Sequence, residues 1–353
     1  MFLNRHLFFL AHPSHLTVWN YKEHQQFELT PEFYLRLFEI LRNPDQFDRM
    51  RATDKQLLAA QILVATKQED LEWGWDVLSK IYHFGTKDIP YASSPKNIKE
   101  WAQQYAQHCK EAIGKVTPVM SSLDEDTAIF LPPPVVDPDR SDLIRNLIER
   151  KTCRQFSGSA VNLSILSTTL YYSLGHLKER EEDEGLVFEE YSKRRCAPSG
   201  GGLNCIEGYV YCSRVTALID GLYYYDPKRH ALFLQSDISD DILGDLLCGQ
   251  HFANDLPFGL FLTGRLDKLW WKYEHSRAYR MALVEAGHVS QCFQLIATAL
   301  GLNTWLTGAL NESPIERLMR NKHKHEHALF FVGAGYSNGE IIPEELKSIL
   351  LEN

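Results

Sequence analysis

Apolar residues recur at helical spacing along the first third of the chain. One such segment opens at Thr30-Pro31 and stops at Asn43-Pro44, because proline fits the first turn of a helix and cannot continue the last one. A second follows Thr53, which forms a capping box with the glutamine three residues later, and a third follows Ser94-Pro95. We therefore expect residues 1–130 to form a mainly helical N-terminal region.

A proline-rich stretch marks the main change in pattern. Leu131-Pro132-Pro133-Pro134 is followed by Asp137-Pro138, and consecutive prolines hold the backbone extended without offering ladder donors. We interpret this stretch as a linker. It divides the chain into the N-terminal region and a domain over residues 131–353.

Beyond this linker, segments with apolar residues at helical spacing alternate with segments typical of strands. Helical spacing covers 141–150, 163–174 and 276–300, and runs of aromatic and branched residues predict strands between them. The expected strands cover 206–213, 222–226, 230–235, 258–263, 304–306 and 328–332. Asp226-Pro227-Lys228-Arg229 is typical of a hairpin turn. The elements predict an α+β domain with an antiparallel-rich sheet and one long core helix.

Charge and cysteine content narrow the class of partner. The 353-residue chain carries a formal net charge of -9, which disfavours nucleic acid and anionic membranes and favours a small or peptidic ligand. The long apolar helix contains Arg280, Glu285 and His288, so it is expected to be buried rather than to span a bilayer. The 7 cysteines are scattered without a C-x-x-C pair, which favours reduced thiols in a cytoplasmic protein.

Several common active-site signatures are absent from the sequence. It contains no P-loop, no G-x-G-x-x-G after a strand, no H-E-x-x-H and no G-x-S-x-G. The alternating His323, His325 and His327 could ligate a metal, but lysines and a glutamate separate them, and we favour a loop entering a strand. No metal site is predicted.

Three local patterns carry possible chemistry. Arg150, Thr152 and Arg154 place two guanidiniums and a hydroxyl at the end of a helix, where they either grip a phosphate or polar ring edge or oppose the helix dipole. The second pattern, Pro198-Ser199-Gly200-Gly201-Gly202, exposes backbone N–H groups against which a flat ligand can lie, although glycine runs more often mark plain turns.

The third pattern is Lys272-Tyr273 ahead of the long helix. Both side chains are ordinarily protonated at neutral pH, so either becomes a base only where its surroundings favour loss of the proton. In the helix, Gly287 costs about 1 kcal/mol relative to alanine, which indicates close packing against another helix or a cofactor and makes a homodimer seam plausible.

Taken in order, these motifs resemble the nitroreductase-like superfamily, and within it the streptolysin- and microcin-type azoline dehydrogenases of thiazole/oxazole-modified peptide biosynthesis. The resemblance runs from Tyr82-His83-Phe84-Gly85 through the three patterns to Leu302. It implies an FMN-binding fold, an obligate homodimer with the flavin at the interface, and oxidation of peptide thiazolines or oxazolines to azoles.

The resemblance also assigns residues. It implies that Lys272 and Tyr273 are catalytic, that Arg150, Thr152 and Arg154 hold the FMN phosphate, ribityl chain or ring edge, and that Gly308 faces the flavin. The loop of Pro198, Ser199, Gly200, Gly201 and Gly202 would contact the isoalloxazine. The implied partners are a heterocyclised precursor peptide and cyclodehydratase components of a synthetase complex. The family's Gly-Gly-Leu-His-Pro stands here as Gly-Gly-Leu-Asn-Cys, and its Val-Gly-Arg ends in Ala334.

Two other readings fit the same sequence. One is an NAD(P)H-dependent nitro- or enone reductase of the same fold, which can bind its reductant without a dinucleotide fingerprint. The other is a peptide-binding scaffold without catalysis, in which the N-terminal helices recruit the substrate or a partner.

Overall fold

The computed structural model describes residues 1–69, 72–88, 94–113, 142–177, 180, 193–238, 242–273, 275–320 and 323–351. The chain forms two compact units. The first comprises Met1–Ala92 and Trp270–Ala278, and the second comprises Ser93–Leu269 and Tyr279–Asn353. The expected linker at 131–134 lies outside the described residues, so the boundary placed there stays a prediction.

The first unit opens with strands. β2 (Leu7–Ala11), β3 (Leu16–Asn20) and β4 (Gln25–Leu29) form an antiparallel three-stranded sheet, and β1 (Phe2–Leu3) pairs with β5 (Leu63–Val64). This sheet was not part of the helical prediction for the N-terminal region. Its strands are short, and their apolar and polar positions alternate too briefly to stand out from helical spacing.

The helices expected in the N-terminal region are confirmed. They are α1 (Pro31–Arg42), α2 (Ala52–Ala59) and α4 (Ile98–Ile113). The structure adds α3 (Val77–Thr86), which the sequence patterns did not single out, and a short 3₁₀ turn η1 (Pro44–Gln46) after α1. The predicted capping box at Thr53 is wrong. α2 begins at Ala52, with Arg51 rather than Thr53 at the cap position, and Thr53 lies buried inside the helix.

A buried ion pair joins the helices of the first unit. The Arg36 guanidinium on α1 donates to both carboxylate oxygens of Asp54 on α2 at 2.8 Å. Arg36 keeps the pKa of Asp54 below its ordinary value through these hydrogen bonds. Val18, Leu37 and Leu57 belong to the apolar core of this unit.

The second unit is built on a six-stranded sheet of order β10-β11-β9-β6-β7-β8, with every neighbouring pair antiparallel. The strands are β6 (Ile206–Cys212), β7 (Gly221–Asp226), β8 (Ala231–Asp237), β9 (Phe258–Arg265), β10 (Asn303–Thr307) and β11 (Glu326–Gly335). Asp226 accepts the amides of Lys228 and Arg229 in the β7–β8 turn. The predicted α+β fold with an antiparallel-rich sheet is confirmed.

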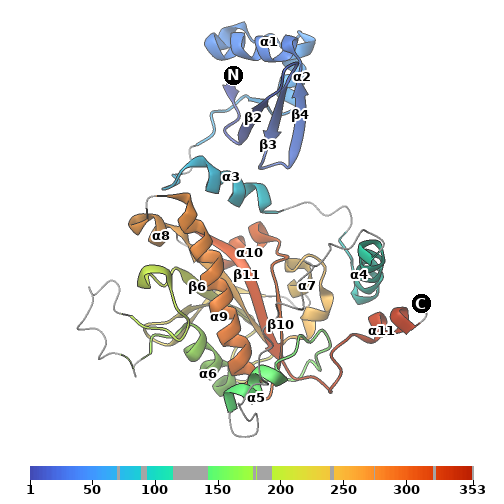
Figure 1. Cartoon of the computed structure of the whole chain (residues 1–353), viewed down its shortest axis with the longest axis vertical. Coiled ribbons are helices and arrows are strands. Elements are labelled where there is room, and N and C mark those ends of the chain that lie inside the picture. The colour runs from blue at the N-terminus through green and yellow to red at the C-terminus, as the bar shows by residue number, and fades with distance from the viewer. Residues whose placement is uncertain are drawn as a thin grey trace, which may run out of the picture. The chain divides into compact units, whose positions relative to one another are not determined.

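Helices cover both faces of this sheet (Figure 1). On one face lies the long α9 (Tyr279–Ala299) with α5 (Asp142–Glu149) and α6 (Leu163–Leu174), and Phe293 of α9 contacts Phe258 of β9. On the other face, α7 (Ile242–Leu246), η7 (His251–Asp255) and α10 (Glu312–Met319) enclose a core around Phe261, Trp305 and Phe331.

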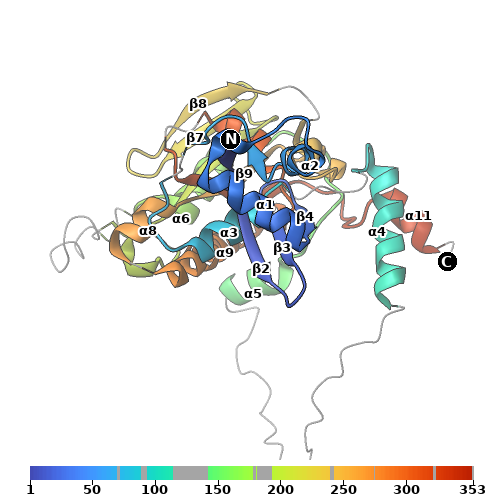
Figure 2. The same ribbon diagram turned by 90° about the horizontal axis from the view of Figure 1, so that it is seen from above.

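The ends of the second unit are also held together. α4 packs beside the C-terminal α11 (Glu344–Leu351), as Figure 2 shows. The remaining elements are α8 (Leu266–Lys272) and the 3₁₀ turns η6 (Gly200–Gly202) and η8 (Ser276–Ala278). In the described part of the chain, no helix is long and apolar enough to cross a membrane.

Candidate active site

The glycine loop predicted to face a flat ligand has a backbone that requires glycine. Gly201 and Gly202 adopt φ values of +66° and +72°, in the left-handed region that side chains disfavour. Asn204 also has a positive φ, and asparagine is one of the residues that tolerate it. The loop folds into η6 and leads directly into the central strand β6.

The loop is attached to the long helix α9. The buried Glu285 carboxylate accepts hydrogen bonds from the Ser199 hydroxyl at 2.6 Å, the Cys205 thiol at 3.3 Å and the Ile206 amide at 3.1 Å. One turn further along α9, His288 Nδ1 lies 3.1 Å from the carbonyl oxygen of Pro198. Both ends of the glycine loop are therefore fixed on one helix.

The arginine-containing segment lies beside β10. The amide of Cys153 donates to the Thr304 carbonyl at 2.9 Å, and Thr152 forms a parallel bridge with Thr304. The Arg154 guanidinium lies over the Tyr105 ring, 5.8 Å from its centroid. Cys153 is buried while Thr152 is exposed, so the segment is tied down by its backbone and presents Thr152 outward.

These groups border the same helix. The Thr304 hydroxyl donates to the Gln294 side chain at 3.3 Å, and Gly308 follows directly on the strand that contains Thr304. From Glu285 to Gln294 the helix rises about 14 Å at 1.5 Å per residue. The glycine loop and the arginine segment thus flank one length of α9.

Lys272 and Tyr273 belong to the first unit. The Lys272 ammonium lies 5.9 Å from the centroid of the Tyr273 ring. The Trp75 indole donates to the Tyr273 carbonyl at 2.8 Å, and Trp75 also meets Trp270 edge to face at 5.5 Å. The predicted catalytic pair is therefore held by residues of the N-terminal region, a support that no local spacing in the sequence indicated.

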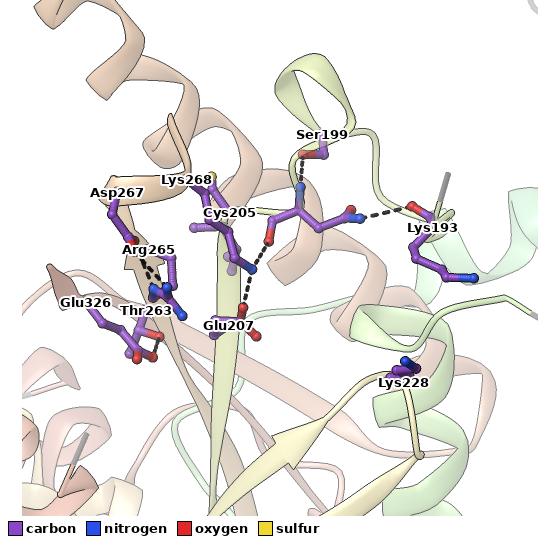
Figure 3. A network of polar contacts seen from close by, with 12 residues as sticks. Lys193, Ser199, Cys205, Glu207, Lys228, Thr263, Arg265, Asp267, Lys268 and Glu326 are labelled. Atoms are coloured by element: carbon purple, nitrogen blue, oxygen red, sulfur yellow. Dashed lines mark hydrogen bonds and ion pairs between the residues drawn. The ribbon is translucent and has the colours of Figure 1, made fainter. Parts of the chain in front are cut away.

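A polar network missed by the sequence analysis surrounds the start of β6 (Figure 3). Lys268 of α8 donates to the Asn204 carbonyl at 3.1 Å and to Glu207 at 2.5 Å. Burial raises the pKa of Glu207, but the cations of Lys268 and Arg195 outweigh it and hold that pKa below its ordinary value. The carboxylate is thus kept charged beside the glycine loop.

A cavity of about 500 Å³ opens on the sheet near this network. Burial and the neighbouring Glu207 raise the pKa of Glu326. Its lining includes titratable side chains from the sheet and the end of α10, among them Glu207, Tyr209, Tyr224, Arg265, Arg320 and Glu326. No residue assigned to FMN from the sequence is among its described lining residues.

Part of α9 and α5 leaves apolar side chains uncovered within the chain. Met281, Leu283 and Val284 are exposed on α9, and a Cβ at Gly287 would meet nothing within 4 Å. The expected close packing at Gly287 is therefore not made by the residues that the structure describes. The α5 residues Leu143, Leu147 and Ile148 are exposed as well.

The described residues hold no group of three or more histidine, cysteine or acidic side chains arranged to bind a metal. His327 lies buried at the start of β11, and His323 precedes that strand.

Comparison with known proteins identifies the family to which the second unit is similar. A profile described as the Nitroreductase family matches residues 147–336. A protein of Methanocaldococcus jannaschii named as a nitroreductase is 28% identical over 191 residues, covering 54% of this chain and 88% of that protein. The trifolitoxin operon protein TfxC of Rhizobium leguminosarum bv. trifolii is 21% identical over 275 residues, covering 74% of this chain and 72% of that protein.

Among solved structures, a chain of the E. coli microcin synthetase McbBCD complex with truncated pro-MccB17 bound is similar to this chain. The two share 19% sequence identity and a TM-score of 0.44, over 69% of this chain and 95% of that chain.

Proposed function

Because the chain belongs to the nitroreductase family, we propose that it is an FMN-dependent dehydrogenase that oxidises peptide thiazolines and oxazolines to thiazoles and oxazoles. The product would be a ribosomally made, modified peptide of the bacteriocin type. The observation that carries the proposal is the pairing of a positive-φ glycine loop with an arginine segment along α9, together with a lysine–tyrosine pair suited to proton removal.

The residues present fit FMN. Gly201 and Gly202 lack side chains where the backbone is left-handed, so their peptide groups can approach a planar ring closely. Arg150, Thr152 and Arg154 offer charge-assisted and neutral donors for the phosphate, ribityl chain or ring edge. Gly308 lies just beyond the strand paired with Thr152. Pro198 and Ser199 complete the loop, and the Ser199 hydroxyl is already used to fix it.

The proposed enzyme is a homodimer with the flavin at the interface. The exposed apolar side chains of α9 and α5 and the uncovered Gly287 form a surface that a second copy can bury. Val284 and Leu147 are 47% and 45% exposed in the single chain. Removing such side chains from water contributes about 25 cal/mol per Å² of apolar area.

The chain's own residues supply the proton chemistry. When bound, FMN supplies the two-electron acceptor, and the proton next to the azoline carbonyl must pass to a base of the protein. We assign that base to Tyr273, whose ring centroid lies 5.9 Å from the Lys272 ammonium. The opposite assignment, with Lys272 as the base, uses the same two side chains.

The substrate and partners follow from the same proposal. The relative from a trifolitoxin operon matches 74% of this chain, which is more than the family domain over residues 147–336, and this favours a peptide substrate over a free nitro compound. We propose that the precursor peptide arrives already heterocyclised and that cyclodehydratase components assemble with this chain. The N-terminal region is the part of the chain beyond the family domain that such partners could contact.

Mass spectrometry of a cyclised precursor peptide tests the function. Incubation with FMN-loaded protein under air should remove two hydrogens per ring. Rapid reduction of the flavin by NADPH, with no change in the peptide, would instead identify a nitro- or enone reductase. A protein that stays colourless after FMN addition would identify a scaffold without catalysis.

A further inference from the structure

We infer that Glu285 is a positioning residue that holds the glycine loop in the conformation needed to contact the isoalloxazine. The inference rests on the proposed flavin function for its consequence. Its structural part, the attachment of the loop to α9, stands on contacts within this chain. Neither the sequence patterns nor the comparisons assign Glu285 a role.

The Glu285 carboxylate accepts hydrogen bonds from both ends of the glycine loop. Oε2 accepts from the Ser199 hydroxyl and the Cys205 thiol, and Oε1 accepts from the Ile206 amide. The side chain is 2% exposed and lies in the middle of α9. Both carboxylate oxygens of Glu285 therefore accept hydrogen bonds from the loop or from the start of β6.

Ser199 extends this attachment across the glycines. Its hydroxyl donates to Glu285 and accepts the Asn204 amide at 2.7 Å. Residues 199 and 204 are thus joined through one oxygen atom, and Gly200, Gly201 and Gly202 close the loop between them. The backbone closes this short loop by adopting positive φ values at Gly201 and Gly202.

The carboxylate cannot be replaced by an amide without conflict. Burial and the neighbouring Glu285 raise the pKa of the Cys205 thiol well above its ordinary value, so the thiol stays protonated and acts as a donor. A glutamine at position 285 would turn an NH₂ group toward at least one of these donors. A buried donor that loses its acceptor is costly, so the loop would loosen.

The test compares Glu285→Gln with Ser290→Ala, both on α9 and both buried. Ser290 donates to the Gly287 carbonyl within the helix and does not touch the loop. Hydrogen exchange at the Ile206 amide, measured without flavin, should accelerate at least tenfold in Glu285→Gln and stay unchanged in Ser290→Ala. Ser199→Ala removes the hydroxyl that donates to Glu285 and accepts the Asn204 amide, but it leaves the carboxylate that accepts the Ile206 amide, so it should give a smaller acceleration at Ile206.

Flavin titration supplies the second readout. Glu285→Gln should weaken FMN and riboflavin by the same factor, roughly tenfold or more, because the loop is proposed to contact the ring that both share. Arg150→Ala should weaken FMN more than riboflavin.

The outcomes separate the inference from the proposed function. Unchanged exchange at Ile206 in Glu285→Gln would overturn the inference, whatever the flavin does. Faster exchange with undiminished riboflavin binding would overturn its flavin part. If the unmodified protein binds neither flavin, the proposed function fails, and the flavin part of the inference fails with it.

Discussion

The indole nitrogen of Trp75 donates a hydrogen bond to the backbone carbonyl of Tyr273, at 2.8 Å. Trp75 precedes α3 in the N-terminal region, and Tyr273 follows α8, so the contact joins segments almost 200 residues apart in the chain. Ser79 and Ser276 add a hydroxyl contact at 2.9 Å, and a Cβ at Gly74 would collide with the Trp270 indole. The N-terminal region thereby supports the segment that carries the proposed base.

Replacing Trp75 with phenylalanine tests this support. The hydrogen bond is lost, which costs about 1 kcal/mol, and the smaller ring gives up part of the packing against Trp270. If that cost falls on the geometry of Tyr273, kcat for azoline oxidation should drop roughly fivefold while the FMN content is unchanged. An unchanged kcat would show that the contact is structural only.

The catalytic pair is tested by Tyr273→Phe and Lys272→Ala. Loss of a positioned general base lowers turnover by about 10²- to 10⁴-fold, and we expect the larger loss in Tyr273→Phe. Peptide oxidation is followed by mass spectrometry, and flavin content by visible absorbance. Full turnover in both variants with FMN retained would disprove the assignment of either residue.

The glycine loop provides a matched pair of alanine substitutions. Gly201→Ala forces a side chain into a left-handed conformation at a cost of about 1–2 kcal/mol, so flavin affinity should fall roughly tenfold. Gly200 has no positive φ, and its Cβ would meet the Met281 side chain at an ordinary 3.4 Å. Gly200→Ala should therefore bind flavin nearly normally. Equal effects of the two substitutions, measured by fluorescence titration, would argue against a loop conformation that matters for binding.

The proposed dimer is tested by placing a charge on its surface. Val284→Glu should produce a monomer that retains little FMN, because burying an unpaired carboxylate opposes association. Lys228→Glu, at the exposed β7–β8 turn, serves as the control. Light scattering after size-exclusion chromatography measures the mass. A dimeric Val284→Glu protein would place the interface elsewhere.

Acid should destabilise the fold through His176. Burial lowers the pKa of His176 to about 4, with the Arg195 cation acting in the same direction. In the unfolded chain the pKa returns to 6.5, so between these pH values the unfolded state binds the proton and the folded state does not. Stability is highest above about pH 6.5 and falls toward about pH 4, by at most about 3 kcal/mol.

The matching measurement is the urea midpoint at about pH 7 and about pH 4.5. His176→Gln should lose less stability between the two than the unmodified protein. Parallel losses would mean that other groups, such as His6, whose pKa burial also lowers, account for the acid sensitivity.

Elements with a strong local pattern could be predicted from the sequence. The helix over 163–174 and the strands starting at Ile206 and Phe258 begin where aromatic and branched runs or helical spacing begin. The short strands β2–β4 were missed because five residues give too little periodicity. Thr53 was misplaced because a threonine near a helix start can cap it or lie inside it, and tertiary packing decides between the two.

The chemistry was predictable in part. Local motifs named the glycine loop and the arginine segment, but the carboxylate that ties Ser199 to α9 lies 86 residues away. Lys268 and Glu207 are similarly separated. Contacts between residues far apart in the chain produce no local sequence motif. The residues that support the candidate site were therefore the ones that the sequence analysis missed.

Anaerobic mixing of FMN-loaded protein with a cyclised precursor peptide tests the central claim most directly. If the chain is an azoline dehydrogenase, the visible flavin absorbance should bleach with the cyclised peptide and stay constant with the same peptide uncyclised. Tyr273→Phe should slow the bleaching without changing the initial spectrum. Flavin that bleaches with NADPH but stays oxidised beside the cyclised peptide would contradict the account.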